Sequence, residues 1–230
     1  MWIVAVALVA SACGHTHPQG PRVEPAAPAT TIDRGPTSSE SDIGGLSQED
    51  VEDQFKALNP QLVECVRRSA GRLPVIGGRA AVRMRITRAG VVRWVFLTES
   101  TLGDREAERC ILRMIQDQTW PRPLSGEGLA ESSFEVEPGE AAGTWPKHKT
   151  AALADRAWRA AARCRKTMAG TYRATAYVGP HGEVLAAGIA PPNAQADEAS
   201  DCIASQLRSL RVGNLTVGQR TVAKVSFPVR

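Results

Sequence analysis

Five cysteines are the residues of this 230-residue chain whose type and spacing point most directly to chemistry. A thiol can form a disulfide, bind a metal or carry a covalent group, and an odd count leaves one thiol outside any pairing. Cys13 stands apart near the N-terminus, whereas the other four fall into two sets, Cys65 with Cys110 and Cys164 with Cys202. Neither set has a CxxC spacing or a neighbouring histidine, so we expect no metal site and no cofactor.

The segment before Cys13 is an apolar run, residues 2–12, which is too short to span a bilayer and is typical of a signal peptide. Ala10-Ser11-Ala12-Cys13-Gly14 resembles a lipobox, although that family prefers Leu where Ala10 stands and no Lys or Arg precedes the run. The resemblance implies a signal peptide over residues 1–12 and a lipid on Cys13. Because Gly14 is not Asp, it implies an outer-membrane lipoprotein facing the periplasm. A plain secretion signal into the periplasm and a truncated membrane anchor are the alternatives.

Two composition changes divide the rest of the chain. Residues 13–46 are rich in Pro, Ser, Thr and Gly without apolar periodicity, which predicts a disordered tether. Ser47-Gln48-Glu49-Asp50 has the pattern of a helix N-cap followed by an acidic first turn. A Gly- and Pro-containing break follows residue 138. We therefore expect folded domains over residues 47–138 and 149–230, joined by a linker over residues 139–148.

The two folded halves repeat one order of elements: helix, strand, strand, helix, strand. Alternating side chains predict the first strand of each half, at residues 80–86 and 172–178, and a glycine turn at Gly90 or Gly182 predicts a hairpin. The return strands change phase in the same way in both halves, which predicts a β-bulge in each. The phase-changing residues are Val92, Val95 and Leu97, and Val184, Ala187 and Ile189.

Helical spacing completes the repeat. In the first half, Asn59-Pro60 is expected to open a turn that carries Leu62, Cys65 and Val66, and Asp104 is expected to cap the second helix. A single apolar stripe marks the second helix of each half. The stripes are Ala107, Cys110, Ile111, Met114 and Ile115, and Ala199, Cys202, Ile203, Gln206 and Leu207. We predict an α+β fold of two tandem α-β-β-α-β domains, each an antiparallel sheet with its helices on one face.

This arrangement assigns the four internal cysteines. Each half places one cysteine on its first helix and one on the apolar stripe of its second helix, and both helices cover the same face of the sheet. We therefore expect the disulfides Cys65–Cys110 and Cys164–Cys202, each worth about 4 kcal/mol in the chain-entropy model. An exported protein meets the oxidising compartment that disulfides require. Two pairs of buried free thiols are the alternative.

The turn before the second helix carries a family resemblance. Ser100-Thr101-Leu102-Gly103-Asp104, followed by Cys110-Ile111, resembles the TonB C-terminal-like superfamily, in particular a cysteine-containing branch from envelope proteins related to gliding motility. That branch also has a Trp-Pro element, matched by Trp120-Pro121-Arg122-Pro123. The resemblance covers roughly residues 48–137, and the second half is a degenerate copy, with Ala190-Pro191-Pro192-Asn193 in place of the turn. It implies a non-enzymatic envelope module that binds a partner peptide by β-augmentation.

Catalytic residues are not evident from the spacing of polar side chains. His15 and His17 lie in the tether, where two ligands cannot hold a metal tightly, and His148 and His181 fall in a linker and a turn. No Ser, His and carboxylate set is indicated, so we expect no enzyme, and a cell-wall enzyme is the weakest of the functions considered.

Charge differs between the halves. Residues 47–140 hold 13 basic and 15 acidic residues, whereas residues 148–230 hold 12 basic and 5 acidic ones. Arg156, Arg159, Arg163 and Lys166 are spaced to form a basic stripe on one helix, a candidate contact for an acidic envelope protein, anionic lipid or peptidoglycan carboxylates. A solvated helix face is the plain alternative. The net charge of +4 for the whole chain gives no reason to expect nucleic acid as a partner.

Three functions follow as expectations. The first is a lipid-anchored interaction module of the envelope. The second is a structural or assembly lipoprotein of a motility or secretion complex. The third, which the family resemblance alone raises, is a component of a TonB-like energy transducer with a truncated anchor.

Overall fold

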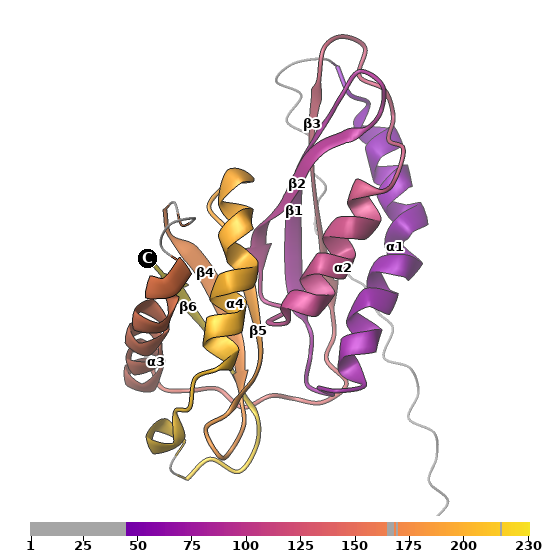
Figure 1. The fold of residues 1–230 in the computed structure, drawn as a ribbon. Coiled ribbons are helices and arrows are strands. Elements are labelled where there is room, and N and C mark those ends of the chain that lie inside the picture. The colour runs from indigo at the N-terminus through magenta and orange to yellow at the C-terminus, as the bar shows by residue number, and fades with distance from the viewer. Residues whose placement is uncertain (1–44, 165–167, 169, 217) are drawn as a thin grey trace, which may run out of the picture.

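The computed structural model of the chain describes residues 45–164, 168, 170–216 and 218–230 (Figure 1). The expected signal peptide, Cys13, nearly all of the tether and Lys166 lie outside the described residues. The first half consists of α1 (Gln48–Ala70), β1 (Gly78–Ile86), β2 (Val92–Ser100), α2 (Arg105–Gln116) and β3 (Gly128–Val136). The second half consists of α3 (Lys147–Ala161), η1 (Ala162–Cys164), β4 (Tyr172–Val178), β5 (Val184–Ala190), η2 (Gln195–Ala199), α4 (Ser200–Arg208), η3 (Gly213–Leu215) and β6 (Ala223–Val229).

The strands form two antiparallel three-stranded sheets, in the orders β2-β1-β3 and β5-β4-β6. The α+β class and the repeated α-β-β-α-β order are therefore confirmed. Both predicted bulges are present as register shifts, between Arg85 and Ile86 on β1 and between Tyr177 and Val178 on β4, each opposite the start of the return strand. A further shift lies between Ala81 and Val82, near the end of the first hairpin.

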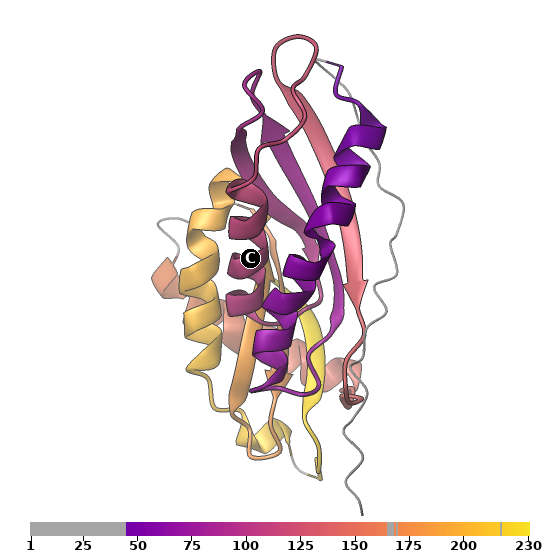
Figure 2. The ribbon, with the colours of Figure 1, turned by 90° about the vertical axis from the view of Figure 1, so that its right-hand side faces the viewer.

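Helices α1 and α2 cover one face of the first sheet, and α4 runs beside α2 (Figure 2). The alternating residues of β1 behave as the sequence predicts, because Val82, Met84 and Ile86 are buried under these helices. Fully burying an aliphatic side chain of this size contributes about 1.5–3 kcal/mol. The same cluster includes Leu62 of α1 and Ile111 of α2, so sheet and helices share one core.

The predicted N-cap at Ser47 is confirmed, whereas the predicted opening of a helical turn at Asn59-Pro60 is wrong. Helix α1 begins after the Ser47 N-cap and continues through Pro60, which lies exposed inside it. A proline there removes one helical hydrogen bond. The helix nevertheless continues because Phe55 before the proline and Leu62 after it pack into the same core.

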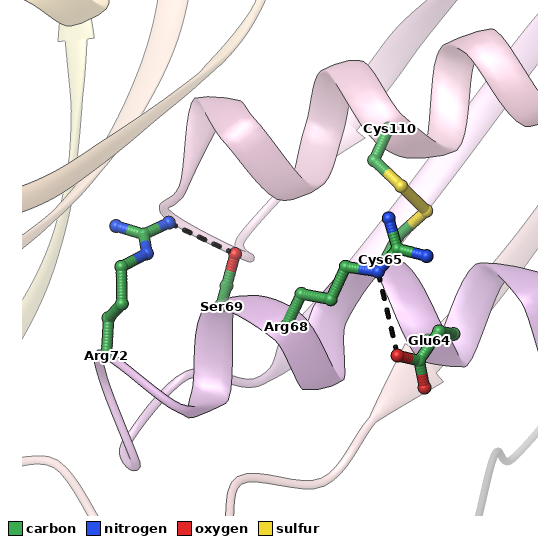
Figure 3. Close-up of a disulfide and its surroundings, with 6 residues drawn as sticks. All are labelled: Glu64, Cys65, Arg68, Ser69, Arg72 and Cys110. Atoms are coloured by element: carbon green, nitrogen blue, oxygen red, sulfur yellow. Dashed lines mark hydrogen bonds and ion pairs between the residues drawn. A yellow bond between two sulfur atoms is a disulfide. The ribbon is translucent and has the colours of Figure 1, made fainter.

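Both predicted disulfides are present. Cys65 and Cys110 join α1 to α2 with their Cα atoms 5.6 Å apart (Figure 3), and Cys164 and Cys202 lie 5.9 Å apart. The sequence predicts Cys164 on the first helix of the second half, but it lies on the 3-10 turn η1, directly after α3. Each bridge thus ties the first helical segment of a half to its second helix.

The second sheet differs from the first in being covered on both faces. Helices α3 and α4 pack on one face, over Ala174, Ala176 and Val178. On the other face, Tyr177, Ala186 and Ala190 belong to the core cluster of the first half. The two halves therefore share a buried junction, whereas the open face of the first sheet carries charged residues such as Arg83 and Arg85.

Candidate functional site

The four outer strands of the two sheets are the places where a partner peptide could add a strand. A sheet edge offers a row of backbone N–H and C=O groups, and proteins usually cover or disrupt such edges. The two edges of the first sheet are β2 and β3, and those of the second sheet are β5 and β6. Their coverage decides which of them can bind a peptide.

Among the described residues, the outer edge of β3 has no backbone partner along its nine residues. The Arg79 N–H on β1 donates to Thr101 Oγ1 on the β2 side. Because backbone groups alternate along a strand, the N–H and C=O groups of the even-numbered residues of β1 point toward β3. The backbone groups of their partners on β3, such as Ala130 opposite Met84, point back toward β1. Backbone groups alternate along a strand, so the odd-numbered residues point outward. Within the described part of the chain, no backbone group bonds to the outward N–H and C=O of these residues, Leu129, Glu131, Ser133 and Glu135.

Strand β2 is occupied at both ends of its outer edge. Gln116 Nε2 of α2 donates to Val92 O at 2.8 Å, and Thr175 Oγ1 of the second half donates to Ser100 O at 3.3 Å. Strand β5 is also blocked, because Glu108 Oε2 accepts from the Ile189 N–H at 2.8 Å. At the other end of β5, the Val212 N–H donates to Gly182 O just before the strand.

The outer edge of β6 is partly occupied by the linker and lacks one donor because of a proline. The Lys224 N–H donates to Gly143 O at 2.9 Å, and the Gly143 N–H donates to Val222 O at 2.8 Å. The alternation of the strand then turns the nitrogen of Pro228 outward, where it has no hydrogen to donate. A shallow pocket of about 380 Å³ between α3 and this edge is lined by Trp145, Phe227 and Pro228. Of the four edges, β3 alone offers an uninterrupted row of donors and acceptors in the described residues.

Pairs of opposite charge cover the open face of the first sheet beside this edge. Arg83 binds Glu131 on β3, and Arg93 Nη1 lies 2.5 Å from Glu127 Oε1 at the start of the strand. The Arg85 guanidinium lies 5.7 Å from the ring centre of Trp94. The arginines of the first hairpin therefore occupy the exposed sheet face, with carboxylates between them.

The predicted basic stripe does not lie on one helix, because Arg156 and Arg159 are on α3 whereas Arg163 is on the 3-10 turn η1, and it is only partly a free surface. Arg156 donates to Asn214 Oδ1 at 2.8 Å and approaches Arg211 O at 3.5 Å, so it holds the loop around η3. Arg159 and Arg163 are exposed, and Lys166 lies outside the described residues. The described arginines thus divide between a structural contact and solvent.

The turn that carries the family resemblance has a clear structural role. Leu102 is buried in the core, and Gly103 has a φ of 72°, a conformation that favours glycine. Asp104 caps α2, as predicted, by accepting from the Glu106 N–H at 3.1 Å. The Trp-Pro element closes the same core, since Trp120 Nε1 donates to Ile115 O at 3.0 Å.

Sequence reasoning missed a buried polar cluster at the junction of the halves. Glu108 of α2 is fully enclosed, and Arg105 lies between Asp197 and Asp201 of the second half, at 3.0 and 2.7 Å. Burial raises the pKa of Glu108 to about 7, against the opposing effect of its hydrogen bonds from Ser100 and Ile189. One signal was available. The residues of β5 that face the junction, Ala186, Gly188 and Ala190, are too small for an exposed sheet face.

The cluster is closed to solvent at its centre in the described structure. Glu108 has no exposed surface through which a substrate could reach its carboxylate. His148 and His181 are both exposed, on the first turn of α3 and in the β4–β5 turn. Among the described residues there is no group of three or more His, Cys, Asp or Glu side chains placed to hold a metal, and no helix long and apolar enough to cross a membrane.

Comparison with family models, curated proteins and solved structures finds no match for this chain.

Proposed function

We propose that this chain is a non-enzymatic envelope lipoprotein that binds an extended segment of a partner protein along the outer edge of β3. The observation that carries the proposal is the nine-residue edge of β3, which has no backbone partner in the described part of the chain, whereas the edges of β2, β5 and β6 are each partly blocked. Backbone hydrogen bonds along an added strand give affinity, and the side-chain pattern gives specificity. The TonB C-terminal-like resemblance supports the same mode of binding for the first half.

The second half then acts as a support. Its sheet is covered on both faces. Glu108 obstructs the edge at β5, and Pro228 removes a donor from the edge at β6. We propose that it stabilises the first half and orients β3. The lipid on Cys13 and the tether over residues 13–46 would hold the module at the outer membrane, facing the periplasm.

Photo-crosslinking in cells tests the binding edge. A crosslinking residue at Glu135, on the outer edge of β3, should capture a protein partner, whereas one at Arg159, on the basic stripe of α3, should not. Ser133→Pro removes one outward N–H and should abolish the crosslink. Ser133→Ala keeps that N–H and is the matched control.

The outcomes separate the candidate surfaces. A crosslink from Arg159 alone would assign binding to the basic stripe, and a crosslink from Glu135 that persists in folded Ser133→Pro would overturn strand addition. Capture from neither position would count against an interaction module. If Ser133→Pro does not fold, slowed amide exchange at Leu129 and Glu131 on adding the captured partner's segment provides the same test.

An assembly role in a motility or secretion complex would use the same edge. Co-purification of the crosslinked partner with such a complex distinguishes the two functions. A part in energy transduction would instead require a partner in the inner membrane. The partner's identity therefore decides among these alternatives.

A further inference from the structure

The junction between the halves is built around one enclosed carboxylate. Glu108 Oε1 accepts from Ser100 Oγ at 2.6 Å, and Glu108 Oε2 accepts from the Ile189 N–H at 2.8 Å. Its side chain has an exposed fraction of 0%. Glu108 therefore connects α2 and β2 of the first half to the edge strand β5 of the second.

A glycine on β5 makes room for this carboxylate. A Cβ atom at position 188 would lie 2.2 Å from Glu108 Oε1 and 2.9 Å from the Asp104 backbone nitrogen. Real Cβ atoms do not approach other atoms so closely, so only glycine fits here. The second half thus carries a notch for the Glu108 side chain.

The charges that face Glu108 do not neutralise it fully. Arg105 Nη1 is 3.9 Å from Glu108 Oε2, which is beyond hydrogen-bond distance. The same guanidinium is shared with Asp197 of η2 and Asp201 of α4. Arg105 is therefore shared among three carboxylates, of which Asp201 also lies 3.7 Å from Arg109 Nη1.

The remaining neighbouring charge opposes ionisation. Asp104, at the N-cap of α2, adds a further repulsion to the Glu108 carboxylate, although its own carboxylate pairs with Arg72 at 2.9 Å. Ser100 on β2 and Ile189 on β5 contribute neutral donors only. Burial is the largest effect on the Glu108 carboxyl and favours its protonated form.

We propose that Glu108 makes the contact between the two halves responsive to pH, so that they dock most firmly in mildly acidic solution and loosen above neutral pH. When the halves are docked, the enclosed carboxyl keeps its proton until near pH 7, where its raised pKa lies. When they separate, solvated Glu108 loses the proton at its ordinary, more acidic pKa. The stabilisation is therefore complete at low pH and is lost as the pH rises through about 7.

Loosening would change what the protein offers to other molecules. It would free the Ile189 N–H, and with it the edge of β5, and it would expose Tyr177 and Ala186 from the shared core. A second strand edge would then become available. The junction thus regulates an edge that is separate from β3.

Amide hydrogen exchange on the whole chain tests this proposal. The protection factor of the Ile189 amide, which corrects for the intrinsic pH dependence of exchange, should fall roughly thirtyfold between about pH 5.5 and about pH 8 in the wild type. In Glu108→Gln, a neutral side chain of the same shape, it should stay constant. Glu198→Gln, an exposed position on η2, is the matched control and should behave as the wild type.

The pH response of the junction can be tested whether or not Glu108→Gln folds. Equal pH dependence in the wild type and in Glu108→Gln would overturn the proposal. If Glu108→Gln does not fold, the Glu108 side-chain carboxyl carbon can be followed by NMR in the wild type. A midpoint in the ordinary acidic range would then refute the proposal, and a midpoint near pH 7 would support it.

Discussion

The hydroxyl of Tyr177 in the second half forms hydrogen bonds with both backbone groups of Gly77 in the first half. The Gly77 N–H donates to Tyr177 Oη at 3.2 Å, and Tyr177 Oη donates to Gly77 O at 3.3 Å. Lys224 Nζ donates to the same carbonyl at 2.6 Å. Burial raises the pKa of Tyr177 to about 12 and lowers that of Lys224. This contact lies at the end of β4 beside the β4–β5 turn, whereas Glu108 meets β5 near its other end, at Ile189, so the junction has a second polar anchor.

Tyr177→Phe should destabilise the protein by about 1–2 kcal/mol, because the buried Gly77 N–H loses its partner while the aromatic packing stays. Urea unfolding followed by far-ultraviolet circular dichroism measures the change. An unchanged free energy of unfolding would show that the Tyr177 hydroxyl does not anchor the junction.

A double-mutant cycle tests whether Tyr177 and Lys224 act on one carbonyl. Either Tyr177→Phe or Lys224→Met alone leaves Gly77 O with one donor, but the two together leave it buried with none. The double variant should therefore lose about 0.5–1 kcal/mol more than the two single variants combined. Strict additivity would mean that the two contacts are independent.

Gly188→Ala should open the junction, because its Cβ would lie 2.2 Å from Glu108 Oε1. We expect a loss of about 1–3 kcal/mol, the range typical of overpacked cores. Gly213→Ala is the matched control, since the nearest atom to its Cβ would be His181 O at 3.6 Å. Thermal unfolding of both variants makes the comparison. Equal stability would contradict the tight fit at position 188.

The repeat was predictable because its signals are local. Residues 80–86 alternate with a period of two, and the stripe around Cys110 follows helical spacing, so each pattern reports the face that the residue buries. Equivalent cysteines in two copies then fixed the disulfides. The bulges were predictable for the same reason, since a change of phase along a strand is visible in the sequence.

The junction could not be predicted in the same way. Glu108 lies on a helix beside exposed Arg109, and a single glutamate there is typical of a side chain exposed to solvent. Its partners Ser100 and Ile189 are 8 and 81 positions away, so no local spacing connects them. The path of α1 through Pro60 also depended on distant contacts, because the core below the helix outweighs the lost hydrogen bond.

Removal of either disulfide should lower the free energy of unfolding by about 4 kcal/mol in the chain-entropy model. The two bridges close loops of similar sequence separation, 45 and 38, so Cys65→Ser with Cys110→Ser and Cys164→Ser with Cys202→Ser should cost similar amounts. Urea unfolding of each double variant, with the other bridge intact, gives the values. A loss below about 1 kcal/mol for either pair would contradict a stabilising role for that bridge.

Asp104 has two roles that graded substitutions can separate. Asp104→Ala removes the α2 cap and the partner of Arg72, and it should cost about 1–2 kcal/mol. Asp104→Asn keeps the cap and loses only the charge, so it should cost less. Ser47→Ala, at the exposed cap of α1, is the matched comparison.

The charge of Asp104 also acts on Glu108. Because that charge contributes to the raised pKa of Glu108, Asp104→Asn should lower the pH at which the Ile189 amide loses protection. Ser47→Ala should leave that midpoint unchanged. A midpoint that stays fixed in Asp104→Asn would show that the Asp104 charge does not reach the junction, even where the cost of the lost cap is as expected.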